Sequence, residues 1–154
     1  MNRLEKWSLW VSFSFTAITG TGLLWTKYFM HTDDPWAVVN HPLEPWLLKA
    51  HIVVAPALVF ALGLISSKHI WQHFKARLAV GRRSGIVTVL MGAAMILTGY
   101  LIQVVTHSAP LQLLAISHIA VSFVFLVGFV AHQLLVGTRP LRRLRMSINR
   151  AIEE

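Results

Sequence analysis

The chain has 154 residues, of which 55% are hydrophobic and only 13% are charged, and its formal net charge is +8. Soluble domains carry about 25% charged residues, so this composition excludes an ordinary soluble domain. The sequence contains no cysteine, which excludes disulfides, iron–sulfur clusters held by thiolates and covalent c-type haem attachment.

Four long uncharged stretches account for the apolar composition: Trp7–Thr26, Ala50–Ser67, Gly85–Thr106 and Ser108–Thr138. Each supplies the roughly 20 apolar residues that cross a ~30 Å hydrocarbon core. We therefore predict an all-α protein, a transmembrane four-helix bundle made of two helical hairpins. Residues 1–154 form a single membrane domain, with spans expected at about 7–28, 47–69, 84–106 and 110–137 and a basic tail at 138–154.

The first span follows Arg3 and Lys6, as a signal peptide would. Its apolar core exceeds the roughly 7–15 residues of a signal peptide, and "GLLWTKYFM" lacks a small-x-small cleavage site, so we expect the span to be retained. This span contains "ITGTGLLW" and the third contains "ILTGYLIQ". Each has a Thr-Gly pair followed by large apolar residues near its outer end, which suggests a parallel repeat of two hairpins.

The basic residues set the predicted orientation. Most of the 14 Lys and Arg lie before the first span, between the second and third, or after the fourth. By the positive-inside rule, both termini and the middle loop are cytoplasmic, in a bacterial-type inner (plasma) membrane. The positive charge beside the spans fits membrane topology and anionic headgroups better than nucleic acid, so lipid is the expected surface partner.

Eight histidines are more than the composition leads us to expect. Four are interpreted as solvated loop or interfacial residues: His31, His41, His73 and His107. The other four lie within or at the margins of the spans: His51, His69, His118 and His132. Ionisable residues at that depth face the bundle interior and usually mark a functional site.

The spacing of these four histidines predicts two matched pairs. His118 and His132 lie about 40° apart around their helix and about 21 Å apart in height, whereas His51 and His69 share one face at about 27 Å. The second and fourth spans run in the same direction, so His51 lies level with His118, and His69 approaches the level of His132. This is the arrangement that bis-imidazole haem ligation requires. We expect His51 and His118 to bind the iron of an outer haem, and His69 and His132 that of an inner haem.

Glycines in the first and third spans could let the helices approach a haem. Gly22 and Gly99, with Gly20 and Gly92 near them, are the candidates, although small-residue helix packing explains them equally well. The proton on the second ring nitrogen of each ligand histidine needs an acceptor, and a carbonyl four residues earlier on the same helix could supply it.

Basic residues near the histidines could pair with haem propionates. Lys49 stands beside His51, and Arg82 or Arg83 stands near the inner end, although membrane topology alone also explains each of them. The histidines themselves could instead be hydrogen-bonded structural residues or a proton path. Zinc is a weaker alternative, because each pair would give only two ligands.

The stretches "SHIAVSFVFLVGFVAHQLL" and "HIWQHFKARLAVGRRSGIVTVLMGAAMILTGYLI" resemble the small membrane-bound b-type cytochromes. That group includes the di-haem cytochrome b subunits of respiratory formate dehydrogenases and hydrogenases. The resemblance implies two b-type haems, a quinone or quinol as substrate, and a redox subunit or a periplasmic cytochrome as partner. It implies an electron-transfer subunit rather than a complete enzyme.

The chain departs from this family in two places. The first span has no histidine, so both haems would lie between the second and fourth spans. The spacing in the second span is eighteen residues, and the position fourteen after His51 is Ile65. If His69 is not a ligand, the inner haem uses His73 or is absent. The competing functions are a transporter or channel subunit that uses intramembrane histidines, and a structural membrane anchor without haem.

Overall fold

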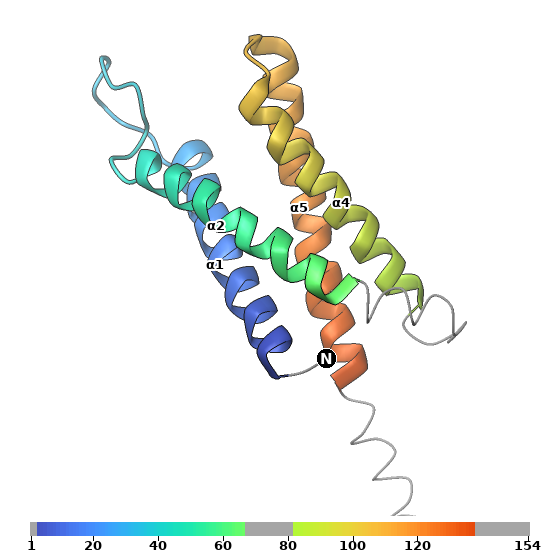
Figure 1. Cartoon of the computed structure of the whole chain (residues 1–154). Coiled ribbons are helices and arrows are strands. Elements are labelled where there is room, and N and C mark those ends of the chain that lie inside the picture. The colour runs from blue at the N-terminus through green and yellow to red at the C-terminus, as the bar shows by residue number, and fades with distance from the viewer. Residues whose placement is uncertain (1–2, 67–81, 138–154) are drawn as a thin grey trace, which may run out of the picture. The chain divides into compact units, whose positions relative to one another are not determined.

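The computed structural model describes residues 3–66 and 82–137 (Figure 1). In these ranges the chain forms four α-helices and no strand: α1 Arg3–Tyr28, α2 Glu44–Ile65, α4 Arg82–Val104 and α5 Ser108–Gly137. α1 packs against α2, and α4 packs against α5. The described residues therefore form two helical hairpins, which belong to two separate compact units. The prediction of an all-helical protein with paired helices is confirmed for the described residues.

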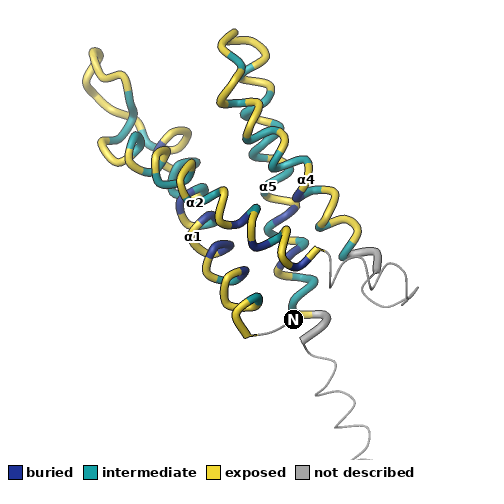
Figure 2. The backbone as a smooth tube through the Cα atoms, in the orientation of Figure 1, coloured by how far each residue is buried: buried dark blue, intermediate teal, exposed yellow. Residues whose placement is uncertain are grey.

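Three helices are long and apolar enough to cross a membrane: Glu44–Ile65, Gly85–Val104 and Ser108–Leu134. Figure 2 shows that buried residues occupy only short segments of the helices and that much of each helix is intermediate or exposed. Large apolar side chains are common on the exposed positions, for example Phe60 and Phe123, each 67% exposed. Helices that present apolar side chains outward are typical of a membrane protein.

α1 is not among these three helices, because seven Ser and Thr residues lower its hydropathy. Several of these hydroxyls are buried and donate hydrogen bonds within the helix. Ser12 donates to the Ser8 carbonyl at 2.6 Å, and Thr26 donates to the Gly22 carbonyl at 3.0 Å. A hydroxyl bonded in this way costs less free energy in an apolar environment than an unbonded one. The fourth span remains a prediction.

The α1–α2 hairpin has a small apolar core in the half away from its loop. Phe13 of α1 and Leu58 and Ala61 of α2 are among its most buried side chains, at 7%, 2% and 1% exposure. α2 starts at Glu44, three residues before the expected span, since Pro45 lies in its first turn, where a missing N–H costs nothing. It continues through Pro56, which membrane helices tolerate.

Asn40 fixes the loop between α1 and α2. Its side-chain amide donates to the carbonyl of Lys27 at the end of α1, at 2.8 Å. Its backbone N–H donates to the carboxylate of Glu44 in the first turn of α2, at 3.3 Å. Asn40 thus donates hydrogen bonds to a carbonyl at the C-terminal end of α1, where helix carbonyls have no intrahelical partner, and to a carboxylate in the first turn of α2. This loop is much longer than the three residues, 105–107, that join α4 to α5.

α4 and α5 approach each other through glycines at every seventh position. A Cβ atom added at Gly92 would lie 3.1 Å from the ring of Phe125, which is 3% exposed. Seven residues towards either end of α4 are Gly85 and Gly99, and seven residues towards either end of α5 are histidines. The three glycines make room for the three large rings of α5 that face them, and this spacing sets the register of the second hairpin.

Candidate functional site

His51 is held by a Thr-Gly pair on the neighbouring helix of its hairpin. Its Nδ1 atom lies 3.1 Å from Oγ1 of Thr19 on α1. A Cβ atom at Gly20 would lie 2.9 Å from Cε1 of the same imidazole, a distance too short for a real contact. Only glycine at position 20 therefore allows this ring to lie against α1. The histidine is half-buried within the hairpin rather than exposed to lipid.

His118 has the same surroundings in the second hairpin. Its Nδ1 atom lies 3.0 Å from Oγ1 of Thr98 and 3.1 Å from the carbonyl oxygen of Met95, both on α4. A Cβ atom at Gly99 would lie 3.2 Å from Cε1 of its imidazole. A threonine, the glycine that follows it and a histidine from the next helix thus meet once in each hairpin.

Each cluster lies at a similar distance from the loop of its own hairpin. Thr19 is nine residues before the end of α1, and Thr98 is six residues before the end of α4. His51 is seven residues after the start of α2, and His118 is ten residues after the start of α5. Each cluster is therefore two to three turns from the loop that joins its helices. We name these two clusters, Thr19–Gly20–His51 and Thr98–Gly99–His118, the outer histidine sites.

His132 lies fourteen residues further along α5, again opposite a glycine. A Cβ atom at Gly85 would lie 3.6 Å from Cε1 of its ring, which is ordinary van der Waals contact. The position fourteen after His51 in the first hairpin is Ile65, a buried apolar residue that is 6% exposed. Among the described residues, both hairpins thus have a histidine at the position nearer the loop, and only the second hairpin has one fourteen residues further along its second helix. His69 and His73 lie outside the described residues.

Each hairpin also contains a buried hydroxyl without a hydrogen-bond partner in the described structure. These are Oγ1 of Thr16 on α1 and Oγ of Ser122 on α5. Ser122 is one turn further inward than His118 on the same face of α5, and Thr16 is one turn further inward than Gly20 on α1. On α1, the hydroxyls of Ser12, Thr19 and Thr26 donate to backbone carbonyls. Unsatisfied hydroxyls at this depth are costly, and they lie close to the outer histidine sites.

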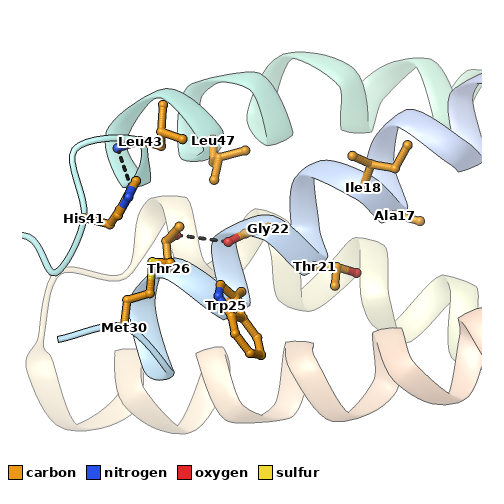
Figure 3. A pocket seen from close by; sticks show the side chains of 10 residues that line it. All are labelled: Ala17, Ile18, Thr21, Gly22, Trp25, Thr26, Met30, His41, Leu43 and Leu47. Atoms are coloured by element: carbon orange, nitrogen blue, oxygen red, sulfur yellow. Dashed lines mark hydrogen bonds between the residues drawn. The ribbon is translucent and has the colours of Figure 1, made fainter.

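An open groove of about 710 Å³ lies at the outer end of the α1–α2 hairpin (Figure 3). Its lining comes from α1, the loop and α2, and includes Trp25, His41 and Leu47. Figure 3 shows the hydrogen bond from Thr26 to the Gly22 carbonyl and the bond that the Leu43 N–H donates to Nδ1 of His41, at 3.1 Å. His41 thus stabilises the turn before α2, in agreement with its interpretation as a loop residue.

The remaining predicted site residues are Gly22, Lys49 and Arg82, of which Gly22 lies against a leucine and Lys49 against a tryptophan rather than a histidine. A Cβ atom at Gly22 would lie 3.3 Å from Leu47, so this glycine serves the packing of α1 on α2. Lys49 is exposed, and its Nζ lies 5.1 Å from the centre of the Trp46 ring, a cation–π contact typical of the membrane interface. Arg82 is the first residue of α4, and its side chain lies outside the described residues.

The sequence did not point to the two threonines as functional residues. Its repeat of Thr-Gly in the first and third spans was visible, but which side chain each pair contacts depends on the register of the hairpin. From the sequence, a backbone carbonyl on the same helix could accept the histidine N–H. The structure places an oxygen atom of Thr19 or Thr98, on the neighbouring helix, within hydrogen-bonding distance of Nδ1 of each histidine. In the first hairpin Gly20 lies against the histidine, whereas Gly22 lies against Leu47.

Within the described residues, no three or more His, Asp or Glu side chains gather into a group that could hold a metal ion. The histidines of the outer sites occur one per hairpin, and each has its own glycine. Comparison with protein-family models, with curated proteins and with solved structures found no match to this chain.

Proposed function

We propose that the chain is a membrane b-type cytochrome that transfers electrons through haems held by histidine pairs. In this proposal His51 and His118 are the axial ligands of an outer haem, and His132 with His69 are those of an inner haem. The repeated outer histidine sites are the observation that supports it. Two hairpins related as a parallel repeat would each offer one imidazole at a similar depth, and bis-imidazole ligation needs two.

The residues around the two histidines fit such a group. Gly20 and Gly99 let each imidazole lie directly against the neighbouring helix, which holds the ring in place for an axial ligand. The unbonded hydroxyls of Thr16 and Ser122 lie one turn further inward and offer polar contacts that the described protein atoms do not use. A porphyrin supplies four nitrogens to its iron, so a cluster of three or more protein ligands is not needed.

A haem supplies one-electron redox chemistry, and the protein supplies the axial ligands, the burial and the spacing. We propose that the electrons pass between the quinone pool and a periplasmic or complex-bound redox partner, as the resemblance to cytochrome b subunits implies. The protein would lie in a bacterial-type inner membrane, with both termini in the cytoplasm and α1 as the fourth span.

The test is the haem content of the full chain purified in detergent, measured by pyridine haemochrome and by reduced-minus-oxidised spectra. We expect about two b-type haems per chain. Because His51 and His118 would share one iron, His51→Ala and His118→Ala should each remove the same haem, and the double variant should remove no more. His132→Ala should remove the other haem.

His107→Ala is the matched control, since His107 is an exposed residue of the loop before α5. It should keep full haem content. A colourless wild-type protein contradicts the proposal and leaves the histidines as structural or proton-carrying residues. If His51→Ala and His118→Ala removed different haems, the pairing across the two hairpins would be wrong.

A further inference from the structure

The Nδ1 atom of His118 has two oxygen atoms within hydrogen-bonding distance, and one of them can only accept. The carbonyl oxygen of Met95, at 3.1 Å, has no proton to donate, so Nδ1 must donate to it. The hydroxyl of Thr98 has one proton, and the carbonyl oxygens of Ala94 at 2.8 Å and Met95 at 3.1 Å lie within reach to accept it. Its lone pairs are therefore what it offers to the imidazole at 3.0 Å.

This count of protons assigns the tautomer of the ring. Since the Met95 carbonyl can only accept, Nδ1 carries the proton of the neutral imidazole. The other nitrogen, Nε2, then has the lone pair. A histidine that binds a metal through Nε2 usually donates its Nδ1–H to an oxygen atom in this way, which fixes the orientation of the ring and raises its basicity.

The first hairpin repeats the arrangement with different residues. The hydroxyl of Thr19 donates to the carbonyl of Phe15 at 2.8 Å, as Thr98 does to Ala94. Its lone pairs face Nδ1 of His51 at 3.1 Å. Gly20 brings α1 close enough for this bond, because a Cβ atom there would collide with the ring. With the Thr19 proton on the Phe15 carbonyl, Nδ1 of His51 donates to Thr19, and we assign the same tautomer to His51 by this parallel.

We propose that Thr19 and Thr98 are positioning residues that hold His51 and His118 as Nδ1–H tautomers, so that Nε2 of each ring is the metal-binding nitrogen. This inference rests on the proposed function for the identity of the metal group. The threonines do not touch the iron and act only through the imidazoles. By increasing the electron density of both axial ligands, they favour the oxidised iron and lower the midpoint potential of the outer haem.

The first experiment follows the tautomers without haem. The full chain, labelled with ¹⁵N-histidine and prepared without haem in lipid nanodiscs, should show His51 and His118 protonated at Nδ1 and not at Nε2. Thr19→Val should move the ring signals of His51 only, and Thr98→Val those of His118 only. The Thr98→Val change should be partial, because the Met95 carbonyl remains as an acceptor.

The second experiment measures the outer haem in the complete cytochrome. Thr19→Val and Thr98→Val should each raise the midpoint potential of the outer haem. Each should also lower the affinity of the protein for that haem, by about 10-fold or more where the threonine supplies the main hydrogen bond to Nδ1. Thr19→Ser and Thr98→Ser keep the hydroxyl and should restore the wild-type potential. This rescue separates a bond to the imidazole from a packing role of the threonine.

Thr26→Val is the control, because Thr26 donates to helix carbonyls in the same way, at 3.0 and 3.2 Å, without a hydrogen bond to a histidine. It should change neither the ring signals nor the potential. Nε2–H tautomers in the wild type, ring signals that ignore the threonine variants, or valine variants with an unchanged potential would each overturn the inference. A wild type that binds no haem but shows both Nδ1–H tautomers overturns the proposed function alone.

Discussion

A single added methyl group would alter the surroundings of each histidine to a different degree. At Gly20 the new Cβ would lie 2.9 Å from the His51 ring, at Gly99 it would lie 3.2 Å from the His118 ring, and at Gly85 it would lie 3.6 Å from His132. Only the last of these distances is an ordinary contact. The three glycines thus form a series in which steric demand changes while the neighbouring ring remains an imidazole.

We expect Gly20→Ala to be the most harmful of the series and Gly85→Ala to be tolerated. Overpacking typically costs about 1–3 kcal/mol, so Gly20→Ala should fall at the upper end and Gly99→Ala lower. Both should also weaken the outer haem, because the imidazole must move. The measurement is chemical unfolding in detergent followed by haem absorbance and by tryptophan fluorescence.

Gly63→Ala provides the control, since a Cβ there meets nothing within 4 Å. It removes a helix-interior glycine and should be neutral or stabilising by up to about 1 kcal/mol. Equal changes in stability for Gly20→Ala, Gly85→Ala and Gly63→Ala would show that the close approach of a glycine to a histidine does not contribute to stability.

At this scale the sequence singled out the histidines as candidate site residues, which stays a prediction, but did not point to the hydrogen bonds that orient them. His118 stood out because an imidazole in an apolar run is costly. Thr98 did not stand out, because a threonine in a helix normally donates a hydrogen bond to a backbone carbonyl of its own helix. Thr98 also does this, to the carbonyl of Ala94. Its second role depends on the facing residue of α5, and no local pattern encodes that residue.

Among the helices, α4 and α5 show how a seven-residue spacing of glycines fixes a register. Gly85, Gly92 and Gly99 make close approaches to His132, Phe125 and His118 in turn. The helix ends lie within four residues of the expected span ends, because hydropathy and Pro45 mark them. The register was not predictable in advance, since glycines at equal spacing also fit general small-residue packing.

An alanine inserted after Ile96 should separate the two histidine environments of the second hairpin. It turns Thr98 and Gly99 by about 100° relative to the rest of α4 and leaves Gly85 in place. We expect loss of the outer haem and retention of the inner one, seen in the spectra and in the haem stoichiometry. An alanine inserted after Val38, an exposed loop residue at 99% exposure, is the control and should keep both haems. An outer haem that survives the insertion in α4 would show that the register is not required.

At the scale of the whole molecule, the number of spans decides on which side each terminus lies. α2, α4 and α5 meet the requirements of length and apolarity, and α1 does not, although its 26 residues reach about 39 Å. Its buried hydroxyls bond to carbonyls of the same helix, as Ser12 and Thr26 show, so their cost inside a membrane is lower than hydropathy suggests. Four spans therefore remain our proposal.

Reporter fusions test this topology. With four spans, an N-terminal and a C-terminal fusion of the full chain should both report the cytoplasm, and a reporter inserted at Val38 should report the periplasm. If the two termini reported opposite sides, α1 would not cross the membrane and the number of spans would be three.

The sequence predicted the two hairpins because the alternation of apolar spans and short polar segments indicates them directly. It also predicted that His51 and His118 belong to one site. The structure establishes the surroundings of each histidine within its own hairpin, and the joint site remains a prediction that the shared loss of one haem would test. The proposed inner site depends on His69. In the first hairpin, the position that corresponds to His132 by spacing, fourteen residues after His51, is Ile65.

The seven-residue glycine spacing also implies that α4 and α5 wind around each other. On a straight helix His118 and His132 would lie about 40° apart, because 3.6 residues per turn do not divide seven evenly. Contacts kept at both ends of a seven-residue repeat require a left-handed supercoil, which removes about 20° in each heptad. Over two heptads this winding removes the 40° offset, so that both imidazoles face α4. The twist of the hairpin, set by Gly85, Gly92 and Gly99, is what aligns two sites about 21 Å apart along one helix.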